Sequence, residues 1–171
     1  MKKIIKIIVI VLIAGFVVIQ FFRPDRTTTE VYGDDHITKN INVPDNVHKI
    51  LKRSCFDCHS DHTTWPWYTN IAPASWLVAK DVRGGRKKMN FSQWAKIPEA
   101  KREARLESIC DEITNDEMPL KEYLLLHGDA KLSQQEKDIL CSWAEAELKK
   151  LEDSNGTEDK NDGEKEEDEE K

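Results

Sequence analysis

An apolar run at the N-terminus most constrains this chain, because residues used there cannot also build a globular core. Ile4–Phe22 holds 19 residues with one lysine, and Lys2 and Lys3 precede it. As a helix the run would be about 28 Å long, close to the hydrocarbon thickness of a bilayer. The lysines favour a cytoplasmic N-terminus. We therefore expect residues 1–22 to be an uncleaved, single-pass anchor in a bacterial inner membrane, with the rest of the chain on the periplasmic side. A cleaved signal peptide is the alternative, although Ile19–Phe22 offers no small-residue cleavage site.

The opposite end of the chain is acidic. Residues 152–171 carry eleven acids and three lysines, a net charge of −8, whereas the whole chain has −6, so the residues before Glu152 sum to +2. Because this end has no apolar residues to bury, it is expected to be a disordered, solubilising tail, with contact to a basic partner as the alternative. The small positive charge of the remainder forms no basic stripe, which argues against nucleic-acid binding.

Two further regions lie between these ends. Residues 23–42 are polar and without period, which predicts a tether. Residues 43–151 number 109, enough for one small domain. Helical periodicity marks 44–55, 72–82, a segment beginning at Pro98 and a segment beginning at Leu132, and no stretch alternates like a strand. The expected fold class is therefore all-α.

Local signals set the expected helix boundaries. Asp45 is the expected N-cap of the first helix, and Gly84 and Gly85 should end the second. Ser133 and Glu136 predict a capping box at the start of the last helix. The apolar faces consist of Val47, Ile50 and Leu51 in the first helix, Leu106, Ile109, Cys110 and Ile113 in the third, and Leu132, Ile139, Leu140, Trp143 and Leu148 in the last.

The pentapeptide "CFDCH" is the strongest chemical signal. A zinc site would need further ligands, but Cys110 and Cys141 stand singly on apolar helix faces. A redox-active thiol pair would be expected in a βαβ setting. The histidine directly after the second cysteine instead favours covalent haem, with Cys55 and Cys58 as thioether anchors and His59 as the proximal iron ligand. The single motif predicts one haem c.

The second iron ligand is expected to be Met118, in the loop "NDEMPLKEY" between the third and last helices. A Met/His ligand pair raises the reduction potential of the iron. The alternatives are Met89, a histidine (His48 or His127), or an open sixth position. Met118 packed on the core without contacting iron is the plain structural interpretation.

Residues after the motif are expected to surround the haem. The expected pocket aromatics are Trp65, Trp67 and Tyr68, and the expected propionate partners are Arg83 and Arg86. An ordinary aromatic core and a solvated basic loop are the alternatives. A backbone carbonyl of Pro66 or Pro73 is expected to accept a hydrogen bond from the outer nitrogen of His59, which would fix its tautomer.

Two stretches, "CFDCHSDHTTWPWYTNIAPASWLVAKDVRGGRKKMNFSQW" and "EMPLKEYLLLHGDAKLSQQEKDIL", resemble the bacterial haem-binding domain family, a cytochrome-c-like group. The resemblance covers Val43 to Trp143. It implies a small, single-haem, class-I-like cytochrome c fold, with Met118 at the family's Met-Pro position. Cys110 and Cys141 do not belong to that pattern. They could form a disulfide, and two separate buried thiols are the alternative.

These features predict a membrane-tethered carrier of single electrons rather than an enzyme. Its partners would be redox proteins, which the sequence does not name, and the machinery that attaches haem c. A haem-based sensor or ligand-binding module with an open or labile sixth position is the main alternative. A protein in which haem only stabilises the fold is a further one.

Overall fold

A computed structural model of the chain describes residues 1–29 and 32–166, with side chains described up to Asp153. Helices joined by turns and irregular segments make up these residues, which contain no strand, so the all-α expectation is confirmed. The chain divides into two compact units. Unit 1 comprises Met1–Val31 and Phe56–Ser92, and unit 2 comprises Tyr32–Cys55 and Gln93–Lys171.

The predicted membrane-spanning helix is wrong. Helix α1 covers Lys2–Ile19, so it includes Lys2, Lys3 and Lys6 and ends before Phe21. From Ile7 to Ile19 its uncharged part is about 20 Å long, well short of a roughly 30 Å hydrocarbon core. Among the described residues, no helix has the length and apolar character that a membrane crossing requires. The expected single-pass inner-membrane location is therefore corrected as well.

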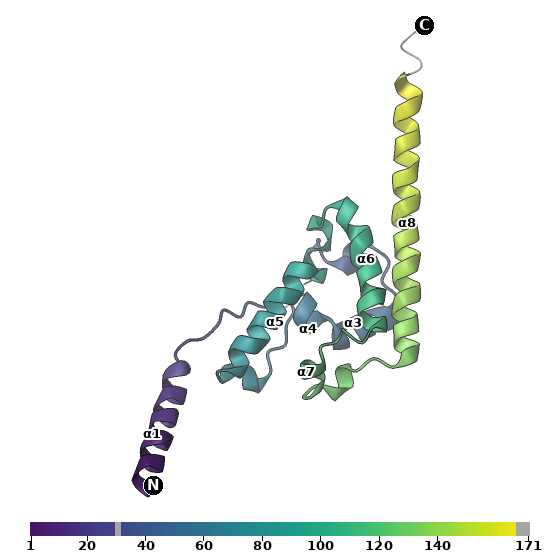
Figure 1. Cartoon of the computed structure of the whole chain (residues 1–171). Helices are drawn as coiled ribbons and strands as arrows, with labels where there is room; N and C mark the ends of the chain where they lie inside the picture. The colour runs from purple at the N-terminus through teal and green to yellow at the C-terminus, as the bar shows by residue number, and fades with distance from the viewer. Residues whose placement is uncertain (30–31, 167–171) are drawn as a thin grey trace. The chain divides into compact units, whose positions relative to one another are not determined.

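Unit 1 is built around α4 (Phe56–His59) and α5 (Ala74–Lys88), which pack side by side, and η1 (Trp67–Asn70), which packs on α5 (Figure 1). The sequence pattern ends the second helix near Val82, but α5 continues through Gly84 and Gly85 to Lys88. Gly85 is buried. Its missing side chain allows close packing, which outweighs the cost of a glycine inside a helix.

The first part of the predicted tether, up to residue 29, belongs to unit 1 and is hydrogen-bonded within it. The Thr29 amide donates to the Asp61 carbonyl at 2.7 Å, and the Thr28 hydroxyl donates to the same oxygen at 3.1 Å. The Arg26 guanidinium donates to the Thr69 carbonyl at 2.9 Å. The polar side chains of this segment hydrogen-bond to backbone groups elsewhere in unit 1. The segment is therefore packed, whereas the sequence suggested a loose linker.

Unit 2 contains the remaining helices: α2 (Ile37–Asn40), α3 (Asp45–Ser54), α6 (Glu99–Thr114), α7 (Lys121–Leu124), η3 (Gly128–Ala130) and α8 (Gln134–Glu166). A further helix, η2 (Phe91–Lys96), spans the boundary between the units and is kinked at Gln93. The main packing is α6 against α8, joined by contacts of α3 with α8 (Figure 1). Buried members of the predicted stripes form this core: Val47, Ile50, Leu51, Leu106, Ile109, Ile113, Leu132, Leu140 and Trp143.

The predicted starts of α3, α6 and α8 lie within two residues of the observed ones, whereas the short helices α2 and α7 were not predicted. Pro44, rather than Asp45, is the N-cap of α3. The predicted capping box is confirmed, since the Ser133 amide donates to Glu136 Oε2 at 2.9 Å and the Glu136 amide donates to Ser133 Oγ at 3.3 Å. Arg53 of α3 adds an ion pair to Glu136 at 2.8 Å. The cap therefore also ties α3 to the start of α8.

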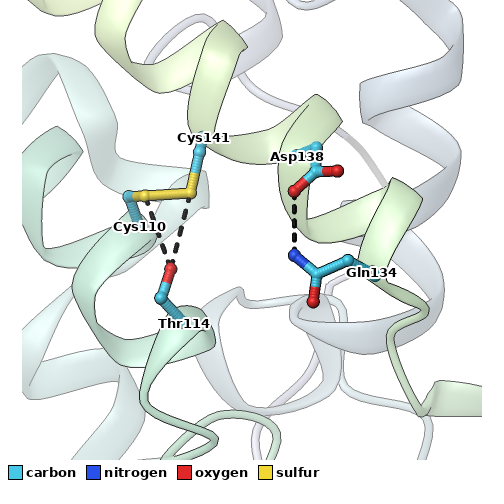
Figure 2. The surroundings of a disulfide bond; sticks show 5 residues. All are labelled: Cys110, Thr114, Gln134, Asp138 and Cys141. Atoms are coloured by element: carbon cyan, nitrogen blue, oxygen red, sulfur yellow. Dashed lines mark hydrogen bonds between the residues drawn. A yellow bond between two sulfur atoms is a disulfide. The ribbon is translucent and has the colours of Figure 1, made fainter.

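A disulfide joins Cys110 of α6 to Cys141 of α8, which decides between the two possibilities left open for these cysteines (Figure 2). The Thr114 hydroxyl lies 3.6 Å from the Cys110 sulfur and 3.8 Å from the Cys141 sulfur. The two cysteines are 31 residues apart in sequence. Closing a loop of this size stabilises a fold by about 3–4 kcal/mol in the chain-entropy model. The bridge therefore fixes the main helix pair of unit 2.

Helix α8 continues through residues 152–166, where the sequence predicted a disordered acidic tail. The tail adjoins an amphipathic helix with no proline between them, and its many glutamates and lysines are good helix formers. Residues 167–171 of the predicted tail lie outside the described residues.

Candidate functional site: the Cys-x-x-Cys-His segment

The motif falls on two consecutive elements. Cys55 is the C-cap residue of α3, and α4 begins at Phe56 and carries Cys58 and His59. Neither Cys55 nor Cys58 belongs to a disulfide. Phe56 is buried, and its ring lies 5.4 Å from that of Phe91 within unit 1. A buried aromatic between the two cysteines thus anchors α4 in unit 1.

Gly85 lets α5 approach α4. A Cβ atom added at Gly85 would lie 2.5 Å from the Cys58 carbonyl oxygen and 3.3 Å from the Cys58 Cβ atom. Real Cβ atoms essentially never come so close to another heavy atom as 2.5 Å. At Gly84, on the same helix, an added Cβ would meet nothing within 4 Å. The close packing of α5 on the motif therefore requires a glycine at position 85 but not at position 84.

The imidazole of His59 is held by a backbone carbonyl. His59 Nδ1 lies 3.0 Å from the Met89 carbonyl oxygen, at the C-cap of α5. An imidazole that donates from Nδ1 presents the lone pair of Nε2 to a metal. The carbonyl that the sequence assigned to Pro66 or Pro73 therefore comes from Met89.

The environment of Cys58 keeps it as a thiol. Its pKa is raised to about 11, mainly by burial and further by the charges of Asp57 and Asp81, while the charge of Arg86 acts in the opposite direction. A thiol with so high a pKa is almost entirely protonated at neutral pH, and protonated thiols react slowly in disulfide exchange. Cys58 is therefore expected to react slowly in thiol–disulfide exchange.

Arg86 is held by hydrogen bonds within unit 1, and its role as a propionate partner stays a prediction. Its Nε donates to the Ser60 carbonyl at 2.8 Å, and its Nη2 donates to Thr63 Oγ1 and to the Thr27 carbonyl, both at 2.9 Å. A fourth bond runs from Nη1 to Thr27 Oγ1 at 3.2 Å. Four of its five N–H groups are thus used within unit 1. Arg86 thus holds the segment after the motif against α5. Arg83 is exposed, and its role as a propionate partner stays a prediction.

The predicted pocket aromatics differ in their surroundings. Trp67 is 75% exposed. Tyr68 is half-buried, and its pKa is raised by burial and, to a lesser degree, by Asp57 and Cys58. Trp65 lies under the Arg26 guanidinium at 5.7 Å, and its indole N–H is buried without an acceptor among the described residues. Such a donor suits a carboxylate, so Trp65 is the aromatic residue that best fits a haem propionate.

The second-ligand candidates are spread over the chain. Met118 lies in the turn after α6, in unit 2, and its role as an iron ligand stays a prediction. Met89 contributes its carbonyl to His59 Nδ1, so its backbone lies on the side of the imidazole that faces away from Nε2. His127 stacks on Tyr123 with ring centroids 4.2 Å apart. His48 packs edge-on against Tyr32 at 5.9 Å.

A zinc site requires at least three suitable side chains close together. No group of three or more His, Cys, Asp or Glu side chains in the described part of the chain is arranged to hold a metal ion.

Sequence reasoning missed two contributors to the site. Gly85 was interpreted as a helix stop, although a glycine inside a helical pattern also signals a close approach of another backbone. The Met89 carbonyl has no sequence signal, because any residue at the end of α5 would supply it.

The short helix α4 carries Cys58 and His59, and the imidazole of His59 is held at Nδ1 by the Met89 carbonyl, so the arrangement is compatible with a haem-binding protein. The model of one such family, the haem-binding domain, matches residues 14–146, more than three quarters of the chain. The chain belongs to the haem-binding domain family. No curated protein and no solved structure matches it.

Proposed function

We propose that this chain binds one haem c covalently through Cys55 and Cys58, with His59 and Met118 as iron ligands, and that it carries single electrons between redox proteins. When bound, the haem supplies a one-electron iron couple. The observation that carries the proposal is the 3.0 Å contact of His59 Nδ1 with the Met89 carbonyl, since it presents Nε2 to a metal. Membership of the haem-binding domain family supports the cofactor.

The state of the cysteines supports covalent attachment. Thioether formation requires two reduced thiols. The disulfide joins Cys110 to Cys141 and does not involve the two cysteines of the motif. The high pKa of Cys58 should slow thiol–disulfide exchange at this residue before the haem is attached. The partner at this stage would be the machinery that attaches haem c.

Attachment is tested with the two cysteine pairs of the chain. The full chain, C55S/C58S and C110S/C141S are produced together with haem c maturation proteins, denatured, and separated on a gel that is stained for haem. We expect haem on the full chain and on C110S/C141S, and none on C55S/C58S. Far-UV circular dichroism verifies that each variant is helical. Haem that stays with denatured C55S/C58S would refute the proposed attachment.

The proposed iron ligands, His59 and Met118, favour electron transfer over the sensing of a small molecule. A methionine in the sixth position leaves no open coordination site for a substrate or a gas, and a Met/His pair gives the iron a raised potential. The test is the response of the full, haem-loaded chain to carbon monoxide. A carrier should bind it slowly and weakly, whereas rapid binding to the ferrous iron would favour the sensor.

A further inference from the structure

The carbonyl that holds His59 belongs to a loop that is itself tied to the segment after the motif. Asn90 directly follows Met89, and its Nδ2 donates to Asp61 Oδ1 at 2.9 Å. The Asp61 amide donates to Ser92 Oγ at 2.9 Å, and the Ser92 amide donates to Asn90 Oδ1 at 3.0 Å. Three hydrogen bonds thus form a closed ring between residues 61 and 90–92.

This ring lies directly beside the imidazole contact. Asp61 is two residues after His59, and Asn90 is one residue after Met89. Two contacts, His59 with Met89 and Asp61 with Asn90, therefore join the same two backbone segments. The three side chains of the ring are half-buried, so the bonds are partly shielded from water.

We propose that Asn90 and Ser92 are positioning residues that set the strength of the His59–Met89 hydrogen bond and, through it, the reduction potential of the iron. This inference rests on the proposed haem c site. A strong Nδ1–H···O bond makes the imidazole a better electron donor, which stabilises the ferric iron. Loosening the ring lets the Met89 carbonyl move, weakens the bond and raises the potential.

The chain offers a matched control. Asn70, also in unit 1, uses its amide in the same way: its Oδ1 accepts from Arg26 at 3.0 Å, and its Nδ2 donates to the Trp67 carbonyl at 3.0 Å. N70A therefore removes comparable hydrogen bonds without touching the loop that carries Met89. S92A is a second, milder variant, since it removes only the acceptor for the Asp61 amide.

The experiment measures the midpoint potential of the full, haem-loaded chain and, by NMR of the reduced form, the solvent exchange of the His59 Nδ1 proton. For N90A we expect the reduction equilibrium constant to rise by about threefold to tenfold, which is roughly 30 to 60 mV for one electron. The exchange of the Nδ1 proton should accelerate. S92A should shift both quantities in the same direction by less, and N70A should leave both unchanged.

Two results would overturn the inference. A potential and a proton exchange in N90A and S92A that equal those of N70A would show that the ring does not act on His59, while the haem site itself stands. A full chain without covalent haem, when a control cytochrome is loaded in the same cells, would overturn the proposed function and this inference with it.

Discussion

The orientation of the His59 imidazole depends on a backbone atom, which any residue type would supply. The Met89 carbonyl accepts from Nδ1, and the sequence pointed instead to prolines near the motif. By contrast, Cys55, Cys58 and His59 are predicted from the sequence alone, because their spacing within five residues is itself the chemical requirement for attachment, and their role stays a prediction. Residue types are therefore predictable where side chains do the chemistry, and backbone contributions are not.

Replacing Met118 tests the sixth ligand. In M118A the haem-loaded chain should lose its sulfur-to-iron absorption band, become high-spin, and fall in potential by on the order of 100 mV, within the range that axial ligands span. Absorption spectroscopy and a redox titration measure both effects. M89A is the matched control, because it removes the rival thioether and keeps the backbone carbonyl that contacts His59. A spectrum of M118A identical to that of the unchanged chain would exclude Met118 as a ligand.

At the scale of helices, the position of α4 depends on one glycine of α5. The pattern of apolar residues predicted a helix from 72 to 82, and α5 runs Ala74–Lys88. The difference arises because glycine has two opposite uses, as a helix stop and as a contact point, and only the tertiary partner decides between them. Here the partner is the backbone of Cys58.

The two glycines of α5 should therefore respond to alanine with opposite signs. G85A places a Cβ atom 2.5 Å from the Cys58 carbonyl oxygen and should destabilise the fold by about 2 kcal/mol. G84A has open space and should stabilise it by roughly 0.5–1 kcal/mol, since alanine is the better helix former. Urea unfolding gives both values. Equal effects of the two variants would mean that α5 does not pack on the motif as described.

The start of α8 should make stability depend on pH. A hydrogen bond from Arg53 and another from Ser133 lower the pKa of Glu136 to about 2 from its usual 4.5. Because the folded pKa is the lower one, the stabilisation is fully present above about pH 4.5 and is lost as the pH falls toward 2. The pair is partly exposed, so solvent screening limits its contribution to about 1 kcal/mol.

E136Q should therefore lose about 1 kcal/mol at pH 7 and unfold with a weaker pH dependence between pH 5 and 2 than the unchanged chain. Thermal unfolding across that range measures the effect. E145Q, at an exposed position of the same helix, is the matched control and should keep the original pH profile. An unchanged profile in E136Q would show that the contact with Arg53 does not form in solution.

For the whole molecule, sequence reasoning succeeded where signals are local. The helical character of the chain and the capping box at Ser133 both depend on residues within a few positions of one another. The membrane-spanning helix was wrong because the apolar run was counted as far as Phe22, whereas α1 ends at Ile19 and includes Lys2, Lys3 and Lys6. Two other features depend on residues far along the chain. They are the packing of residues 23–29 within unit 1 and the disulfide partner of Cys110. Neither follows from local pattern.

The most direct test of the central claim is an absorption spectrum of the full chain, made together with haem c maturation proteins and recorded in ferric, reduced and denatured forms. Covalent attachment with His59 and Met118 as ligands predicts sharp reduced bands, a haem that stays with the denatured chain, and a weak far-red sulfur-to-iron band in the ferric form. A chain that carries no haem, although a control cytochrome from the same cells is loaded, would contradict the account.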